Sequence, residues 1–138
     1  MKFIKIIINL WNFLTGRTAR HNRALRHVRD WAAAVQKFLS DYRLYGTSDI
    51  GFLLGNTRQA NFDLTALTHK GNALIQPAAQ IRNAQVSPLL TKVVDEIENM
   101  RRALMNPALR STRAPEVASR LRISFEKLQE KLVVIEFI

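Results

Sequence analysis

Residues 17–45 read RTARHNRALRHVRDWAAAVQKFLSDYRLY, and this stretch decides the fold. Its first half has an arginine at every third position and no acidic residue, whereas its second half is apolar and aromatic. This spacing predicts one long helix over residues 17–45, with Thr18 as its N-cap. The apolar side chains that recur at intervals of three and four, and so form its buried face, are Leu25, Val28, Ala32, Val35, Leu39 and Tyr42.

The arginines of this helix wrap around its first turns and do not form one straight line: Arg17, Arg20, Arg23, Arg26 and Arg29. Positive charge at a helix N-terminus opposes the helix dipole by roughly 0.3–1 kcal/mol per residue, and an anionic partner would offset that cost. Guanidinium groups are well suited to phosphate. We expect these side chains, with Arg110 and Arg113 later in the chain, to hold a nucleic-acid backbone without reading its sequence.

Composition limits the classes of function that the chain can serve. The 138 residues fit one domain spanning 1–138, and 47% hydrophobic with 23% charged residues is ordinary for a globular protein. There is no cysteine, and the five glycines form no phosphate-binding loop. Three neighbouring acids, Asp95, Glu96 and Glu98, are expected on a solvent-facing helix surface. We therefore expect a non-catalytic protein with no metal and no cofactor.

The positive charge of the chain is unevenly distributed. The formal net charge is +10 at pH 7. Residues 1–45 hold nine Lys and Arg against Asp30 and Asp41, whereas the remaining residues hold twelve against nine acids. This imbalance favours a polyanionic partner, either nucleic acid or an anionic membrane surface.

Residues 1–16, MKFIKIIINLWNFLTG, are predicted to form an apolar helix that ends at Gly16. About 13 helical residues would be roughly 20 Å long, which is shorter than the roughly 30 Å hydrocarbon core of a bilayer. Polar residues interrupt the apolar run and no small-x-small cleavage site follows it, so we expect no cleavable signal peptide. A cytoplasmic or virion location is favoured.

Three interpretations of this segment remain open. It is either a nearly buried helix of the bundle or a helix that inserts residues 3–14 into a membrane interface. In the third interpretation, residues 3–8 form a strand that pairs with the β-branched residues 132–138. The side chains expected to dock on a membrane or on a partner protein are Phe3, Ile4, Ile7, Ile8, Trp11, Phe13 and Leu14.

Residues 56–138 are predicted to supply the remaining helices. Pro115 is expected to open the last helix after a basic loop, and Gly71 to mark a close approach of two backbones. The pattern predicts an all-α helical bundle of four to five helices with an apolar N-terminal helix. The helices expected before the basic loop 108–114 lie at about 57–76, 78–86 and 87–106.

The string Arg20-His-Asn-Arg-Ala-Leu-Arg-His27 is similar to the Arg-polar-x(4–6)-His motif of the HEPN ribonucleases. These eight residues carry the whole resemblance. It implies an all-α domain, commonly a dimer, whose arginine and histidine line a cleft between protomers and promote attack by the RNA 2′-hydroxyl. On this resemblance, Arg20 and His27 would be the catalytic pair.

These features together predict a non-catalytic, basic helical protein for binding and assembly, such as a structural subunit of a virion or a nucleoid. The apolar ends and the charge-poor middle of the chain favour a homo-oligomer or a subunit of a larger assembly. The first alternative is a peripheral membrane-associated protein that inserts residues 3–14 and places its arginines on lipid headgroups. The second is the HEPN-like ribonuclease.

Overall fold

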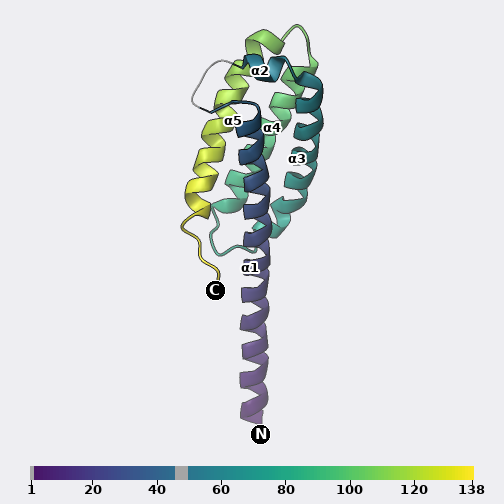
Figure 1. The fold of residues 1–138 in the computed structure, drawn as a ribbon. Coiled ribbons are helices and arrows are strands. Elements are labelled where there is room, and N and C mark those ends of the chain that lie inside the picture. The colour runs from purple at the N-terminus through teal and green to yellow at the C-terminus, as the bar shows by residue number, and fades with distance from the viewer. Residues whose placement is uncertain (1, 46–49) are drawn as a thin grey trace.

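The computed structural model describes residues 2–45 and 50–138, and the side chains of residues 16–45 and 50–138. Within these ranges the chain forms helices and no strand, which confirms the all-α helical bundle. Figure 1 shows α1 beside three antiparallel helices, with the short α2 at one end. The helices are α1 (Lys2–Asp41), α2 (Gly51–Leu54), α3 (Thr57–Ala78), α4 (Val86–Met105) and α5 (Arg110–Leu132).

The core of the bundle lies where the apolar spacing predicted it. Leu25, Val28 and Leu39 on α1 are fully buried, as are apolar residues on each of the other helices. Gly71 lies at a close contact, but with side chains and not with a second backbone as expected: a Cβ atom there would lie 2.6 Å from Val94 Cγ2 and 2.8 Å from Trp31 Cζ2. Gly71 thus lets α3 pack directly against α1 and α4.

The predicted break at Gly16 is wrong, because α1 runs without interruption from Lys2 to Asp41. Glycine in a helix interior costs only about 1 kcal/mol relative to alanine, and the residues on both sides favour a helix. Figure 1 shows that the first part of α1, residues 2–15, continues past the end of the other helices. We call these residues the arm. The side chains expected to dock from this segment lie outside the described residues.

The predicted end of the long helix at Tyr45 is also wrong. Arg43 adopts a left-handed conformation with φ 57°, and the Leu44 N–H donates to the Leu39 carbonyl at 2.8 Å. This bond from Leu44, the residue after the left-handed Arg43, is the Schellman motif, which usually places glycine or asparagine at the left-handed position. Because arginine stands there, the sequence gives no signal of the helix end.

Two further boundaries differ from the sequence-based expectation. The short helix expected at 78–86 is absent from this described segment: α3 reaches Ala78 and the chain turns before α4 begins at Val86. The basic loop expected at 108–114 is largely helical, because α5 begins at Arg110 and includes Pro115 in its second turn. Proline costs α5 a backbone hydrogen bond there, but burial of Ala114 and Val117 in the core offsets it.

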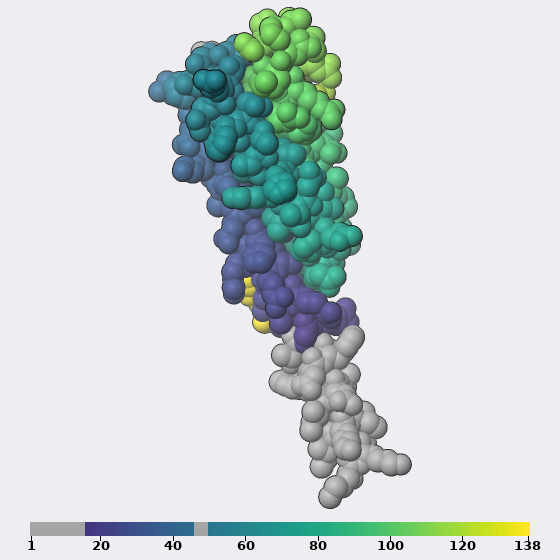
Figure 2. All heavy atoms as spheres, turned by 90° about the vertical axis from the view of Figure 1, so that its right-hand side faces the viewer, coloured from purple at the N-terminus to yellow at the C-terminus, as the bar shows by residue number. Residues whose placement is uncertain are grey.

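The third interpretation of the N-terminal segment, in which residues 3–8 form a strand that pairs with 132–138, is wrong, since residues 2–41 are helical. Residues 133–138, which we call the tail, leave the end of α5 and cross to α1. Figures 1 and 2 both show the yellow tail beside α1, at the end of the bundle from which the arm emerges.

Candidate functional site

Four arginines lie on the exposed side of α1 where it leaves the bundle, and we call Arg17, Arg20, Arg23 and Arg26 the arginine belt. All four side chains are exposed. With 3.6 residues per turn, each successive arginine is turned by about 60° around the helix, so the belt covers about half of its circumference. Along the axis the belt spans about 13–14 Å. It presents positive charge around the helix and not along one face.

Three of the four belt arginines, Arg20, Arg23 and Arg26, are available to an external partner. Arg20, Arg23 and Arg26 make no ion pair or side-chain hydrogen bond with any residue that the structure describes. The nearby His21, Ala24 and other buried residues turn the opposite side of α1 into the bundle. The nearest acid on α1 in sequence is Asp30, one turn beyond Arg26.

Arg29, the fifth predicted phosphate contact, has a structural partner instead. Its guanidinium group donates to the carbonyl of Leu132 at 2.8 Å and also to the carbonyl of Ile135. It lies 5.0 Å from the ring centroid of Phe137, in cation–π geometry. Arg29 therefore binds the end of α5 and the tail, and its charge is half-buried.

His21 and Asn22 hold the tail from the same turn of α1. His21 Nε2 donates to the Glu136 carbonyl at 2.9 Å, while its Nδ1 accepts the Arg82 backbone N–H at 2.9 Å. These two roles assign the neutral Nε2–H tautomer to the ring. The Asn22 amide donates to the Ile138 carbonyl at 3.0 Å and accepts the Ile138 N–H at 2.9 Å.

Sequence reasoning missed this role of His21, although a signal for it was present. His21 lies four residues before Leu25, so it continues the four–three spacing of the buried face. Only 1% of His21 is exposed, and both ring nitrogens find partners far away in the chain. The spacing alone could have placed the histidine in the core, but not its partners.

Arg110 and Arg113 do not join the belt, because they lie at the opposite end of the bundle. Figure 2 shows the connection from α4 to α5 in bright green at the end away from the tail. Arg110 Nε donates to the Leu104 carbonyl at 2.9 Å, so it caps the last turn of α4. The structure thus divides the seven predicted arginines into the belt, the tail-binding Arg29 and this distant pair.

The proposed ribonuclease pair, Arg20 and His27, lies on one side of α1, two turns and about 10 Å apart along the axis. Both residues are exposed. His27 lines a groove between α1 and α3, of about 370 Å³, together with Asp30 and Lys70. The two residues therefore lie on the exposed surface of a single helix.

The groove continues between α1 and α3 toward the α2 end, because Ala34 and Lys70 also line a second hollow of about 210 Å³. Trp31 forms part of its lining and donates its indole N–H to the Leu67 carbonyl at 3.0 Å. Near its far end, the Tyr42 hydroxyl donates to Asp63 at 2.8 Å. Burial and then this bond raise the pKa of Tyr42. The groove carries charges of both signs and so favours no one ligand class.

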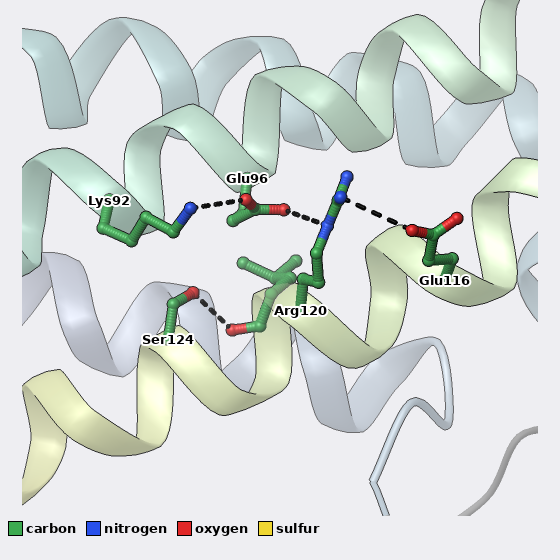
Figure 3. Close-up of polar contacts among 6 residues, drawn as sticks. Lys92, Glu96, Glu116, Arg120 and Ser124 are labelled. Atoms are coloured by element: carbon green, nitrogen blue, oxygen red, sulfur yellow. Dashed lines mark hydrogen bonds and ion pairs between the residues drawn. The ribbon is translucent and has the colours of Figure 1, made fainter.

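One expected solvent-facing acid is buried instead. Glu96 is 2% exposed and receives Lys92 Nζ and Arg120 Nε, each at 3.2 Å, one on each carboxylate oxygen. Figure 3 shows Arg120 of α5 between Glu96 of α4 and Glu116, which lies one turn earlier on α5, so the Arg120–Glu96 pair crosses the interface of the two helices. Because the carboxylate is fully paired, this cluster joins two helices and offers no catalytic acid.

The described residues form neither a metal site nor a membrane-spanning helix. Among the residues described, no group of His, Asp or Glu is arranged to hold a metal ion. In the part of the chain that the structure describes, no helix is both long and apolar enough to cross a bilayer. Comparison of the chain with protein-family models, curated proteins and solved structures finds no match.

Proposed function

We propose that the protein is a non-catalytic, peripheral membrane-binding helical bundle. One observation carries the proposal: the exposed arginine belt turns through about half of the circumference of α1 at the junction between the bundle and the apolar arm. In this proposal the arm enters the membrane interface, and the arginines contact anionic lipid headgroups. The bundle stays in water and is available to partners.

The angular spread of the belt around α1 favours a membrane surface over a nucleic-acid strand as the partner. A nucleic-acid strand lying along α1 would be matched best by arginines on one face of the helix. The belt turns through about 180° from Arg17 to Arg26, so one strand would meet only part of it. A membrane surface crossed by the helix surrounds it, and long arginine side chains reach along the helix to headgroup level.

The sequence of the arm fits the same partner. Residues 3–14 are apolar apart from Lys5, Asn9 and Asn12, and Trp11 is a residue type that favours the interface. The arm continues α1 away from the other helices (Figure 1), so the bundle does not cover its length. An apolar helix in this position needs another covering, and an interface of lipid provides one.

Vesicle flotation of the full chain tests the proposal. We expect binding to phosphatidylserine–phosphatidylcholine vesicles that weakens with salt, and little binding to phosphatidylcholine alone. Replacing Arg20, Arg23 and Arg26 with glutamine should weaken binding by about 100-fold, at about 1 kcal/mol per basic residue.

A matched control separates the belt from net charge. Replacing Arg58, Lys70 and Arg113 with glutamine lowers the formal charge equally, from +10 to +7, but leaves the belt intact. This variant should bind nearly as well as the unchanged protein. An equal loss in both variants would contradict a role for the belt, and no binding by the unchanged protein would overturn the proposal.

A second experiment tests the nucleic-acid alternative. Binding of the protein to labelled single- and double-stranded nucleic acid is measured across the same salt series. Three phosphate contacts would give a log–log slope near −3 on duplex. Such binding without any binding to vesicles would replace the membrane proposal with the nucleic-acid function that composition first favoured.

A further inference from the structure

The tail presents its backbone to the bundle and its apolar side chains to the outside. His21, Asn22 and Arg29 bind five backbone groups of the tail and of the adjoining end of α5. Ile135 alone packs inward, with 8% of it exposed. The outward side chains and their exposed fractions are Val133 74%, Val134 69%, Phe137 47% and Ile138 58%.

This arrangement is unfavourable for a segment surrounded only by water. Apolar surface left in water forgoes about 25 cal/mol per Å² that burial would gain. Here α1 uses buried or half-buried polar side chains to fix the tail, and the result displays four large apolar groups on one short segment. A fixed apolar display next to cations indicates a binding surface.

We infer that the tail is a second membrane-contacting element, which inserts Val133, Val134 and their outward neighbours into an anionic lipid interface beside the arginine belt. The inference rests on the proposed membrane function and adds to it the residues and the orientation of contact. The tail and the belt lie at the same end of the bundle, since Ile138 binds Asn22 between Arg20 and Arg23. The bundle would then stand with this end on the membrane.

Charge favours lipid over the other partners that an apolar patch could take. A second copy of the chain also carries a formal charge of +10, so association through two arginine belts would bring like charges together. Nucleic acid gains from cations and stacking rings, but three of the four outward side chains are aliphatic. An anionic bilayer offers both an apolar layer and negative headgroups.

The direct test uses the absence of cysteine from the chain. Val134→Cys and, as control, Phe62→Cys are each labelled with a polarity-sensitive fluorophore. Phe62 is 70% exposed, on α3. With phosphatidylserine–phosphatidylcholine vesicles, the label at 134 should shift to the blue and the label at 62 should not.

The affinity test keeps the charge constant. Val133→Gln with Val134→Gln should weaken flotation with these vesicles by about tenfold, the loss expected for withdrawing a few methyl groups from lipid, whereas Phe62→Gln should not. Denaturant unfolding should be unchanged in both variants, because the replaced side chains are exposed.

The outcomes distinguish the tail from the belt. Unchanged affinity of the double glutamine variant, with no blue shift at 134, would overturn this inference while the arginine variant still tests the membrane function. Absence of vesicle binding by the unchanged protein would remove both. A tail-dependent rise in molecular mass without lipid would assign the surface to a second copy and so also overturn the inference.

Discussion

Gly71 is the position where the absence of a side chain matters most. A Cβ there would lie 2.6 Å from Val94 Cγ2 and 2.8 Å from Trp31 Cζ2, and the indole is fixed by its bond to Leu67. We expect Gly71→Ala to destabilise the bundle by about 1–3 kcal/mol, because overpacking outweighs the better helix propensity of alanine. Chemical denaturation measures this, with Gly16→Ala as control.

Gly16 is the matched control because a Cβ there meets nothing within 4 Å. Helix propensity then acts alone, and Gly16→Ala should be neutral or stabilising by up to about 1 kcal/mol. If Gly71→Ala proved as harmless as Gly16→Ala, the close packing of α3 on α1 and α4 would be refuted.

Glu98 should make the stability of the folded protein depend on pH. The bidentate hydrogen bond from Arg101 lowers the pKa of Glu98 below its ordinary value of 4.5, against the opposing effect of burial. Since the folded pKa is the lower one, the stabilisation is present above pH 4.5 and is lost as the pH falls through the folded value. Glu98→Gln should therefore cost about 0.5–1 kcal/mol at pH 7 and little in acid.

The measurement is denaturant unfolding of the unchanged protein and of Glu98→Gln between pH 7 and about pH 2. This range includes pH values at which Glu98 is charged and values at which it is protonated. The difference between their unfolding free energies should shrink toward acid. A constant difference would mean that the Arg101 contact contributes nothing through charge.

At the level of residues, the local spacing of side chains predicted which of them are buried, but not which hydrogen-bond partners they have. Leu25, Val28 and Leu39 are buried as expected, and Gly71 lies at a close contact. Arg29 looked the same as the other arginines, but its carbonyl partners lie more than 100 residues away, at separations of 103 and 106. No repeat within one helix can reveal a bond of that range.

At the scale of elements, α1 matters because one rigid helix connects the arm to the bundle. Gly16→Pro would remove the backbone hydrogen bond at that position and clash with the preceding turn. We expect lower helix content by circular dichroism, an unchanged unfolding free energy of the bundle, and weaker vesicle binding. The bundle should survive because its core on α1 begins several residues later, at His21 and Ala24.

Gly16→Ala again serves as the comparison, since it preserves the helix and should bind vesicles at least as well as the unchanged protein. Full binding by Gly16→Pro would show that the arm and the belt act independently. Loss of the bundle in that variant would instead show that the arm is part of the folded core, and would contradict its placement in Figure 1.

Two errors in the predicted elements arise because tertiary contacts override local signals, whereas the error at Gly16 is local, since the flanking residues favour a helix. Arg43 takes the left-handed position usually given to glycine, so α1 ended earlier than its sequence indicated. Pro115 was expected to begin α5, yet burial of Ala114 extended the helix upstream. Gly16 was expected to end a helix that in fact continues. Helix number and class were predictable because they depend on periodicity, which these contacts leave intact.

At the scale of the whole molecule, the question is whether the folded bundle or the arm alone creates the membrane site. A ligand that binds only the folded state stabilises it by RT ln(1 + [L]/Kd), or about 1.4 kcal/mol for each tenfold excess. Folding brings the tail to Asn22 and Arg29 across more than 100 residues of chain, at separations of 116 and 106. Anionic vesicles should therefore raise the melting temperature of the bundle, and vesicles of phosphatidylcholine should not. The double glutamine variant at Val133 and Val134 should show a smaller rise. If binding is strong but the melting temperature stays constant, the arm binds equally well from the unfolded chain, and the arrangement of belt and tail contributes no affinity.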